Sequence, residues 1–347
     1  QKVAEKAPNR ESLRREMEET RIYVATLASI LGRMELFTLK HFHLALVDEA
    51  SQIPEPQLIG LLPRFDKFIL IGDHNQLATI VLQQPSHSRI EEMPLREAGI
   101  NDCRDSLFER LIRRSASQGW DHAAAQLSRQ GRMHEEIAAF PARQFYGGNL
   151  FTASEWQSEQ WQLSPGKNDP LQHLAGTMRT AFLSTEKLNH NSSSDKINEP
   201  EAVVIVNLLQ SIRDLYLANG KMFQPGRIGI IAPYRNQIAL IRHLLLTAGI
   251  PGAEEVMIDT VERFQGSQRD LILLSFCVNR PYQMQFLCNL NHDGTVDRKL
   301  NVAITRSRQQ LFLVGNARIM KQHPVYASLL THYRKKMIIL EPEEINF

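Results

Sequence analysis

The sequence of 347 residues predicts an α/β fold with parallel sheets, divided between two domains. Short apolar, β-branched runs alternate with longer stretches of helical period, which is typical of parallel strands connected by helices. The length suits two domains of roughly 150 residues each. Polar, turn-rich stretches interrupt the periodic pattern, as surface loops do.

Seven runs are predicted to be strands, at residues 22–28, 44–47, 68–71, 179–183, 228–232, 271–276 and 311–314. Six stretches are predicted to be helices, at residues 54–62, 106–114, 134–145, 201–217, 237–248 and 302–307. Three polar stretches are interpreted as surface insertions, at residues 83–105, 156–176 and 189–195. The first strand–helix series ends near residues 123–127, so we expect a first domain at 1–125 and a second at 126–347. The first would need a missing half to complete its sheet.

The composition is that of an ordinary water-soluble globular protein, with 43% hydrophobic and 22% charged residues. No apolar run approaches the ~18–20 residues that cross a bilayer, so we expect no membrane partner. Three cysteines without a CxxC pair favour the cytoplasm, or the nucleus of a eukaryote, over secretion. The net charge of +2 permits a nucleic-acid partner without predicting one. The charged start at Gln1 leads us to expect a fragment of a longer protein.

His41 and His43 form an H-x-H pair, but no cysteine or carboxylate cluster lies near them in the sequence to complete a zinc site. We interpret the two as histidines at the edge of a strand and predict no metal role for them.

Residues 44–52, Leu-Ala-Leu-Val-Asp-Glu-Ala-Ser-Gln, form an apolar strand that ends in two carboxylates, Asp48 and Glu49. Open parallel sheets bind ligands at this carboxyl edge. In a nucleotide-hydrolysing site the first carboxylate would hold Mg²⁺ and the second would polarise the attacking water. An acidic strand end that caps the next helix is the alternative, and this motif alone does not separate the two.

A second strand ends about twenty residues later in Gly-Asp-His-Asn-Gln-Leu, residues 72–77. The glycine allows a tight exit from the strand, and Asp73 and Gln76 are then expected to face the same edge as Asp48 and Glu49. A neutral amide there could hydrogen-bond a γ-phosphate or the attacking water. An Asx-type turn is the alternative, and it weakens when both strand ends are considered together.

Two segments of the second domain carry arginines suited to a phosphoryl group, Arg132 in residues 130–134 and Arg306 in residues 300–308. A guanidinium is a rigid, permanently charged fork that can neutralise such a group. For either arginine taken alone, a solvated surface position is the alternative.

Two further polar strand ends suit contacts to a single strand of nucleic acid. Residues 261–270 hold a glycine-containing turn before a strand, and residues 228–237 end a strand in Pro233, Tyr234 and Arg235. Each alone could be an ordinary junction between a strand and a helix.

Together these segments, in this order and spacing, resemble the motifs of superfamily 1 helicases. The nearest branch contains the nonsense-mediated-decay RNA helicase and the Okazaki-fragment helicase–nuclease. Residues 48–51 are similar to motif II, 72–77 to motif III, 130–134 to the arginine motif, 261–270 to motif V, 300–306 to motif VI, and 22–29 to the end of motif Ib or Ic. The resemblance covers the chain from about residue 22 to 316.

The resemblance implies two RecA-like (P-loop NTPase) domains, the first one incomplete, with ATP and Mg²⁺ between them. The implied partner is single-stranded DNA or RNA, with movement from 5′ to 3′. The implied catalytic residues are Glu49 for water activation, Gln76 for γ-phosphate sensing, and the arginine fingers Arg132 and Arg306. The implied nucleotide contacts are Asp48, which also holds Mg²⁺, Gln130, Gly266 and Gln268. The implied nucleic-acid contacts are Thr26, Pro233, Tyr234, Arg235, Gln265 and Thr305.

The family's phosphate-binding loop, GxxxxGK[ST], is missing from the sequence. The Gly-Lys pairs at 166–167 and 220–221 lack the upstream glycine, the hydroxyl and the preceding strand. In the family this loop precedes motif II, so we expect it upstream of Gln1 and predict that this chain alone is inactive. Smaller departures are Gly131 in place of an aromatic residue, Glu262 and Gln268 in place of Asp and Glu, and Ala78-Thr79 in place of a proline.

The leading hypothesis is therefore a motor-core fragment of an ATP-dependent helicase or translocase. A non-catalytic, helicase-like module that binds nucleic acid or a protein is the alternative, favoured by the missing loop and opposed by the intact set of catalytic side chains. A nucleotide kinase is disfavoured by the arginines of the second domain and by motif V. The oligomeric state stays open.

Overall fold

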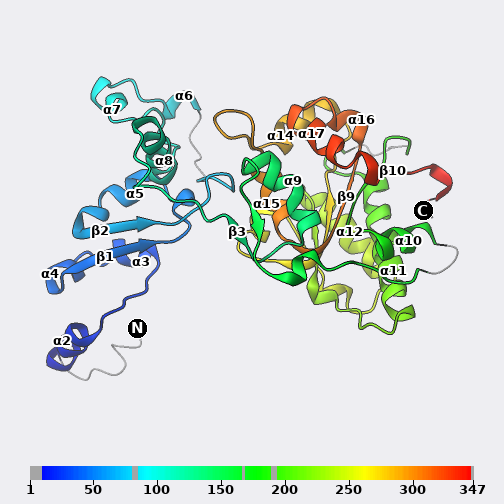
Figure 1. The fold of residues 1–347 in the computed structure, drawn as a ribbon, viewed down its shortest axis with the longest axis horizontal. Coiled ribbons are helices and arrows are strands. Elements are labelled where there is room, and N and C mark those ends of the chain that lie inside the picture. The colour runs from blue at the N-terminus through cyan, green and yellow to red at the C-terminus, as the bar shows by residue number, and fades with distance from the viewer. Residues whose placement is uncertain (1–9, 80–84, 166–168, 189–193, 345–347) are drawn as a thin grey trace. The chain divides into compact units, whose positions relative to one another are not determined.

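The computed structural model describes residues 10–79, 85–165, 169–188 and 194–344. Within them the chain forms two compact units (Figure 1). The first unit holds the chain as far as His74 together with Ala78–Ala124, and the second holds Asn75–Leu77 and the chain from Ala125 onward. No helix among the described residues combines the length and the apolar character needed to cross a membrane.

The sheet of the first unit has two parallel strands in the described part, β1 (Phe42–Val47) and β2 (Phe65–Leu70). They pair in register from Phe42 opposite Phe65 to Val47 opposite Leu70, so the two strands end together. Both strands were predicted. The helices of this unit are α2 (Arg10–Glu19), α3 (Leu27–Leu31), α4 (Leu36–Leu39), α5 (Glu55–Ile59), α6 (Pro85–Ser88), α7 (Met93–Glu97) and α8 (Leu107–Gln118).

The buried core of the first unit is small. It consists of Ala45, Leu58, Leu62 and Leu107, with a fringe of partly buried neighbours. Four apolar side chains of the two strands stay between 45% and 64% exposed: Leu44, Leu46, Phe68 and Ile69. A two-stranded sheet is marginal by itself, and a folded domain normally covers such a surface. The described part of the first unit thus leaves apolar surface of its two strands uncovered.

The predicted strand at 22–28 is wrong, because this segment is irregular and then enters α3. Its β-branched residues Ile22 and Val24 suggest a strand, yet their side chains are largely exposed and pair with nothing in a sheet. The Thr26 hydroxyl instead accepts a hydrogen bond from the Ser29 N–H at 3.2 Å and caps the helix.

The second unit is built on six parallel strands in the order β10-β5-β9-β8-β6-β7. The strands are β5 (Thr180–Ser184), β6 (Ile228–Ile231), β7 (Met257–Asp259), β8 (Arg269–Ser275), β9 (Ser307–Gly315) and β10 (Met337–Ile339), with a separate two-stranded ladder of β3 (Arg129–Gln130) and β4 (Phe151–Thr152). Its α-helices are α9 (Glu135–Phe145), α10 (Pro170–Thr177), α11 (Glu199–Ala218), α12 (Arg235–Thr247), α13 (Val261–Phe264), α14 (Met284–Leu287), α15 (Arg298–Thr305), α16 (Ala317–Met320) and α17 (Pro324–His332).

Helices cover both faces of this sheet (Figure 1). Along β9, Leu311 and Leu313 pack into the core that includes α9, α15 and α17. The alternate residues Phe312 and Val314 pack into the core that includes α10, α11 and α12. Strands buried on both faces are apolar at consecutive positions, which is why β5, β6, β8 and β9 were all predicted from the sequence.

Other elements differ from prediction. The strands β7 and β10 were missed because three residues carry almost no periodic signal. The insertion predicted at 156–176 is wrong in its second half, where α10 buries Leu174 and Ala175. That helix has a start signal, Asp169 before Pro170, with the carboxylate accepting from the N–H of Leu171 at 2.8 Å. The helix predicted at 302–307 is displaced, since α15 begins at Arg298. Residues 80–84 and 189–193, which fall at or within predicted insertions, lie outside the described residues.

Candidate nucleotide and nucleic-acid sites

The first unit presents the two predicted carboxylates directly after β1. Asp48 and Glu49 are both exposed, and Glu49 has a left-handed backbone, with φ of 52°. The Asp48 carboxylate accepts from the Glu49 N–H at 2.9 Å, while the Glu49 carboxylate accepts from the Gln52 amide at 2.6 Å. A positive φ at a residue other than glycine is strained and is often kept at functional sites.

The end of β2 lies beside this carboxylate turn. The Ile71 N–H donates to the Val47 carbonyl and the Ala50 N–H donates to the Ile71 carbonyl, each at 2.8 Å. A Cβ on Gly72 would lie 3.0 Å from the Ser51 nitrogen, so a side chain there would force the two strand ends apart. The structure thus brings Asp73, at the exit of β2, next to the carboxylate segment.

Gln76 belongs to the second unit, unlike Asp73. Its side-chain oxygen accepts a hydrogen bond from the Arg306 guanidinium at 3.2 Å. The neighbouring Asn75 is held twice: its amide donates to the Phe145 carbonyl and its own carbonyl accepts from the Asn301 amide, each at 2.8 Å. Leu77 is buried in the same core as α9 and α15. Three consecutive residues of motif III therefore pack with the second unit.

The two predicted arginine fingers meet at the end of α15. Arg306 is only 2% exposed, and its Nε donates to the Val302 carbonyl at 3.1 Å. Arg132 is half-buried, and its Nη1 lies 3.4 Å from the Thr305 carbonyl. A buried guanidinium needs acceptors on all sides, and Gln76 supplies one of those of Arg306, beside Val302 and the Thr305 hydroxyl.

Two predicted contact residues are engaged inside the protein. The Gln130 side-chain oxygen accepts from the N–H groups of Arg132 and Met133, at 2.9 and 2.7 Å. The Thr305 hydroxyl donates to the Asn301 carbonyl at 2.8 Å, and Thr305 is buried. In this structure both side chains position the arginine segments, and neither presents a free polar group to a ligand.

The remaining predicted contacts lie around the strands β6, β7 and β8. Pro233, Tyr234 and Arg235 lie between the end of β6 and the body of α12; Arg235 is exposed, and partial burial raises the pKa of Tyr234. The segment after β7 contains Gln265, whose side-chain nitrogen is buried without a hydrogen-bond partner among the described residues. A buried donor of this kind calls for a ligand or ordered water.

Gly266 and Gln268 follow in the same loop, and Thr26 lies in the first unit. Gly266 has φ of 75° and open space where a Cβ would stand, so its backbone conformation, not crowding, favours glycine. Gln268 is exposed. Thr26 is exposed and serves as the helix cap described above.

Magnesium and nucleotide fit this set of residues in part. Exposed carboxylate oxygens at Asp48 and Glu49 are the ligand type that Mg²⁺ prefers. A phosphate-binding loop, however, opens a helix, and Gly220-Lys221 follows the end of α11 instead, with Gly220 at φ of 64°. The other Gly-Lys pair, residues 166–167, is outside the described residues.

A buried carboxylate at the start of α11 was not predicted. Glu201 is fully buried, and its carboxylate accepts from the Ser275 hydroxyl and from the Cys277 N–H, each at 2.7 Å. The Asn198 side chain caps the helix by accepting from the Glu201 N–H at 2.8 Å. The spacing Asn-x-x-Glu before an apolar run is a helix-start signal that could have identified this pair. Burial raises the pKa of Glu201 to about 7, although these hydrogen bonds lower it.

This carboxyl predicts a pH-dependent stability. The folded protein holds the Glu201 proton more tightly than the unfolded chain, where the pKa is 4.5. The Glu201 carboxyl therefore contributes to the stability of the fold below pH 4.5, and this contribution is lost as the pH rises towards 7. We expect the free energy of unfolding, relative to Glu201→Gln, to fall by roughly 3 kcal/mol across this window. Urea unfolding between pH 4.5 and 7.5 measures it.

The matched control is Glu199→Gln, an exposed carboxyl two residues earlier in the same helix. Its difference from the native chain should not change with pH. A flat difference for Glu201→Gln as well would contradict the assignment of a proton to this buried site.

Comparisons with known proteins agree with the motif order. An AAA-domain family matches residues 103–318, and a second family, also described as an AAA domain, matches residues 1–84. The "DNA replication ATP-dependent helicase/nuclease DNA2" of Mus musculus is 30% identical over 325 residues, which are 88% of this chain and 28% of that protein. The "Regulator of nonsense transcripts 1" of Dictyostelium discoideum is 31% identical over 317 residues, which are 89% of this chain and 21% of that protein.

Among solved structures, "The structure of PRRSV helicase" aligns with 80% of this chain and 36% of its own, at 12% identity and a TM-score of 0.35. The chain spans less than a third of the length of the two curated relatives. Because the first AAA-domain match covers more than half of the chain, and the relatives are the two helicases that the motifs resemble, the chain belongs to the AAA-domain family, in the superfamily 1 helicase branch.

Proposed function

We propose that this chain carries the hydrolysis and coupling residues of an ATP-dependent motor on single-stranded DNA or RNA, working in the cytoplasm or nucleus. Residues 1–125 form part of its first RecA-like domain and residues 126–347 its second. The observation that carries this proposal is the cluster of Gln76, Arg132 and Arg306 at the end of α15. The Arg306 guanidinium is buried, and the Arg132 guanidinium and the Gln76 amide are half-buried. Together they would form a preorganised electrostatic site for a transferring phosphoryl group.

Each residue has a proposed role in that site. Asp48 would hold Mg²⁺, which would supply charge neutralisation when bound, and Glu49 would take the proton of the attacking water. Gln76 reports the γ-phosphate to the second domain, because Asn75 and Leu77 tie it there. Arg132 and Arg306 stabilise the charge that develops, while the segments of Gln130, Gly266 and Gln268 line the nucleotide. We propose that closing and reopening of the two domains steps the chain along a strand in the 5′-to-3′ direction.

The proposed contact to nucleic acid in the first unit is Thr26. In the second unit the proposed contacts are the turn of Pro233, Tyr234 and Arg235, with Gln265 as a further donor. The buried, unpartnered nitrogen of Gln265 supports a ligand here. We propose that Thr305 positions the backbone and does not contact nucleic acid, because its hydroxyl is buried and donates to the Asn301 carbonyl. A non-catalytic binding module remains the second candidate, since no GxxxxGK[ST] is present in the sequence.

Binding of single-stranded nucleic acid by the 347-residue chain tests the proposal. We expect Arg235→Ala to weaken binding of a labelled single-stranded oligonucleotide and to reduce the salt slope of log K by about 0.7, the loss of one phosphate contact. Tyr234→Ala should cost about 1–3 kcal/mol if a base stacks on the ring. Fluorescence anisotropy at several salt concentrations, with DNA and with RNA, measures both.

The control is Arg318→Ala, an exposed arginine of α16. It should leave the affinity and the salt slope close to those of the native chain. Equal effects of Arg235→Ala and Arg318→Ala would show that general charge, and not this turn, holds the strand.

A further inference from the structure

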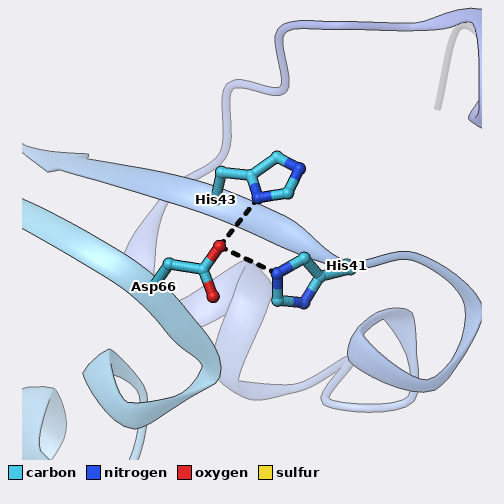
Figure 2. A group of neighbouring side chains, drawn as sticks. All are labelled: His41, His43 and Asp66. Atoms are coloured by element: carbon cyan, nitrogen blue, oxygen red, sulfur yellow. Dashed lines mark hydrogen bonds and ion pairs between the residues drawn. The ribbon is translucent and has the colours of Figure 1, made fainter.

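The H-x-H pair of the first unit has a third potential ligand that the sequence did not reveal. His41 immediately precedes β1, and His43 is its second residue. Asp66 on β2 lies between them: its Oδ2 is 2.9 Å from Nε2 of His41 and 2.7 Å from Nδ1 of His43 (Figure 2). The prediction that no carboxylate completes this pair is therefore wrong.

Strand register explains why the three side chains meet. β1 and β2 are parallel, with Phe42 opposite Phe65 and Leu44 opposite Lys67, which places His43 beside Asp66. Side chains alternate along a strand, so His41 and His43, two residues apart, project to the same side. The carboxylate is 23 residues from the nearer histidine in sequence, and pairing of the strands alone brings it there.

We propose that His41, His43 and Asp66 form a binding site for a divalent d-block metal ion such as Zn²⁺. The donor set is two imidazole nitrogens and one carboxylate oxygen, a combination that zinc and related ions accept. One ligand atom from each residue lies within 4.8 Å of the others. In a tetrahedral zinc site, with bonds of about 2.0–2.1 Å, ligand atoms lie about 3.4 Å apart. Small rotations of these side chains reach that separation.

The surroundings allow an ion to enter and water to complete its coordination. The side chains of His41, His43 and Asp66 are 60%, 82% and 49% exposed. The two rings stand at 80° to each other with centroids 4.8 Å apart, in an edge-to-face arrangement. An exposed ion pair alone contributes little to the free energy of folding. A bound metal ion would instead link the starts of both strands.

This site is distinct from the one proposed for Mg²⁺. Asp48 follows the carboxyl end of β1, five residues after His43, which corresponds to about 16 Å along a strand. The proposed metal joins the starts of β1 and β2, in a unit whose buried cluster has four residues in the described part of the chain. The ion would therefore act as a cross-link between strands, and its position does not depend on the proposed motor function.

Calorimetric titration of the 347-residue chain with Zn²⁺ tests the proposal. We expect one ion per chain, and a loss of affinity greater than ~10-fold in His43→Ala and in Asp66→Asn, since even a lost outer-shell partner costs that much. Asp48→Asn should bind as the native chain does, which separates this site from the carboxylates after β1. His292→Ala is the matched control, because His292 and Asp293 are an exposed pair, 3.5 Å apart, and no third ligand joins them among the residues that the structure describes.

Circular dichroism establishes that each variant is folded, and His41→Ala replaces any variant that is not. A rise in the thermal midpoint on adding Zn²⁺, present in the native chain and absent in His43→Ala and Asp66→Asn, would support the cross-link. Absence of zinc binding by the native chain would overturn the proposal. Native affinity in His43→Ala and Asp66→Asn would overturn it equally, because the ion would then be held elsewhere.

Discussion

Replacing Glu49 by Gln is expected to lower the turnover number for ATP by ~10²–10⁴, the usual contribution of a general base. The measurement needs a protein extended upstream through a GxxxxGK[ST] loop, because this chain is predicted inactive alone. Gln keeps the size of the side chain and an oxygen that can accept from Gln52. ATP affinity should change little, since the lost group acts on the attacking water.

The control is Glu35→Gln, which changes an exposed glutamate of the same unit outside the proposed site. It should hydrolyse ATP at the native rate. Native turnover in Glu49→Gln would remove Glu49 from the mechanism, and a large loss of ATP binding would show that the change affects the site's structure.

Replacing Arg306 by Lys is expected to lower turnover by ~10³–10⁵, the range found for arginine fingers. Lysine keeps the charge but lacks the fork that reaches Val302 and Gln76 at the same time. Because Arg306 is buried, the same change should also lower stability, so thermal unfolding is measured beside the rate. The prediction concerns the rate of molecules that remain folded.

Arg308→Lys is the matched control two residues later. Arg308 pairs with Asp270 at 3.2 Å and lies over the Trp156 ring, contacts that do not involve the proposed nucleotide cluster. Its turnover should stay within a few-fold of native. If both changes reduced turnover equally, the loss would reflect general disturbance of β9, and the finger role of Arg306 would be abandoned.

The sequence predicts best the strands that are buried on both faces of a sheet, because every residue there must be apolar. The strand β9 is an example: Leu311 faces one core and Phe312 the other, so residues 311–314 are all apolar. The strand before Asp48 was also predicted, because an apolar run ends there at two acidic residues. Where one signal competed with another, prediction failed, as at residues 22–28, where the Thr26 cap outweighs the β-branched pattern.

The partners of side chains could not be predicted where they depend on strand register or chain path. Asp66 meets His43 only because two parallel strands pair in one register. Asn75 of motif III is held in the second unit by its contacts with Phe145 and Asn301. The partners of Asn75 are 70 and 226 residues away along the chain, and Asp66 is 23 residues from His43. A single sequence carries no local signal for partners at such separations.

The most direct test of the motor proposal is ATP hydrolysis with and without single-stranded DNA or RNA, on this chain and on a protein extended upstream through a GxxxxGK[ST] loop. We predict that the extended protein hydrolyses ATP faster when a strand is present and that this chain does not hydrolyse ATP. Failure of both proteins to hydrolyse ATP, with the strand still bound by this chain, would contradict the motor proposal and leave the binding module as the function.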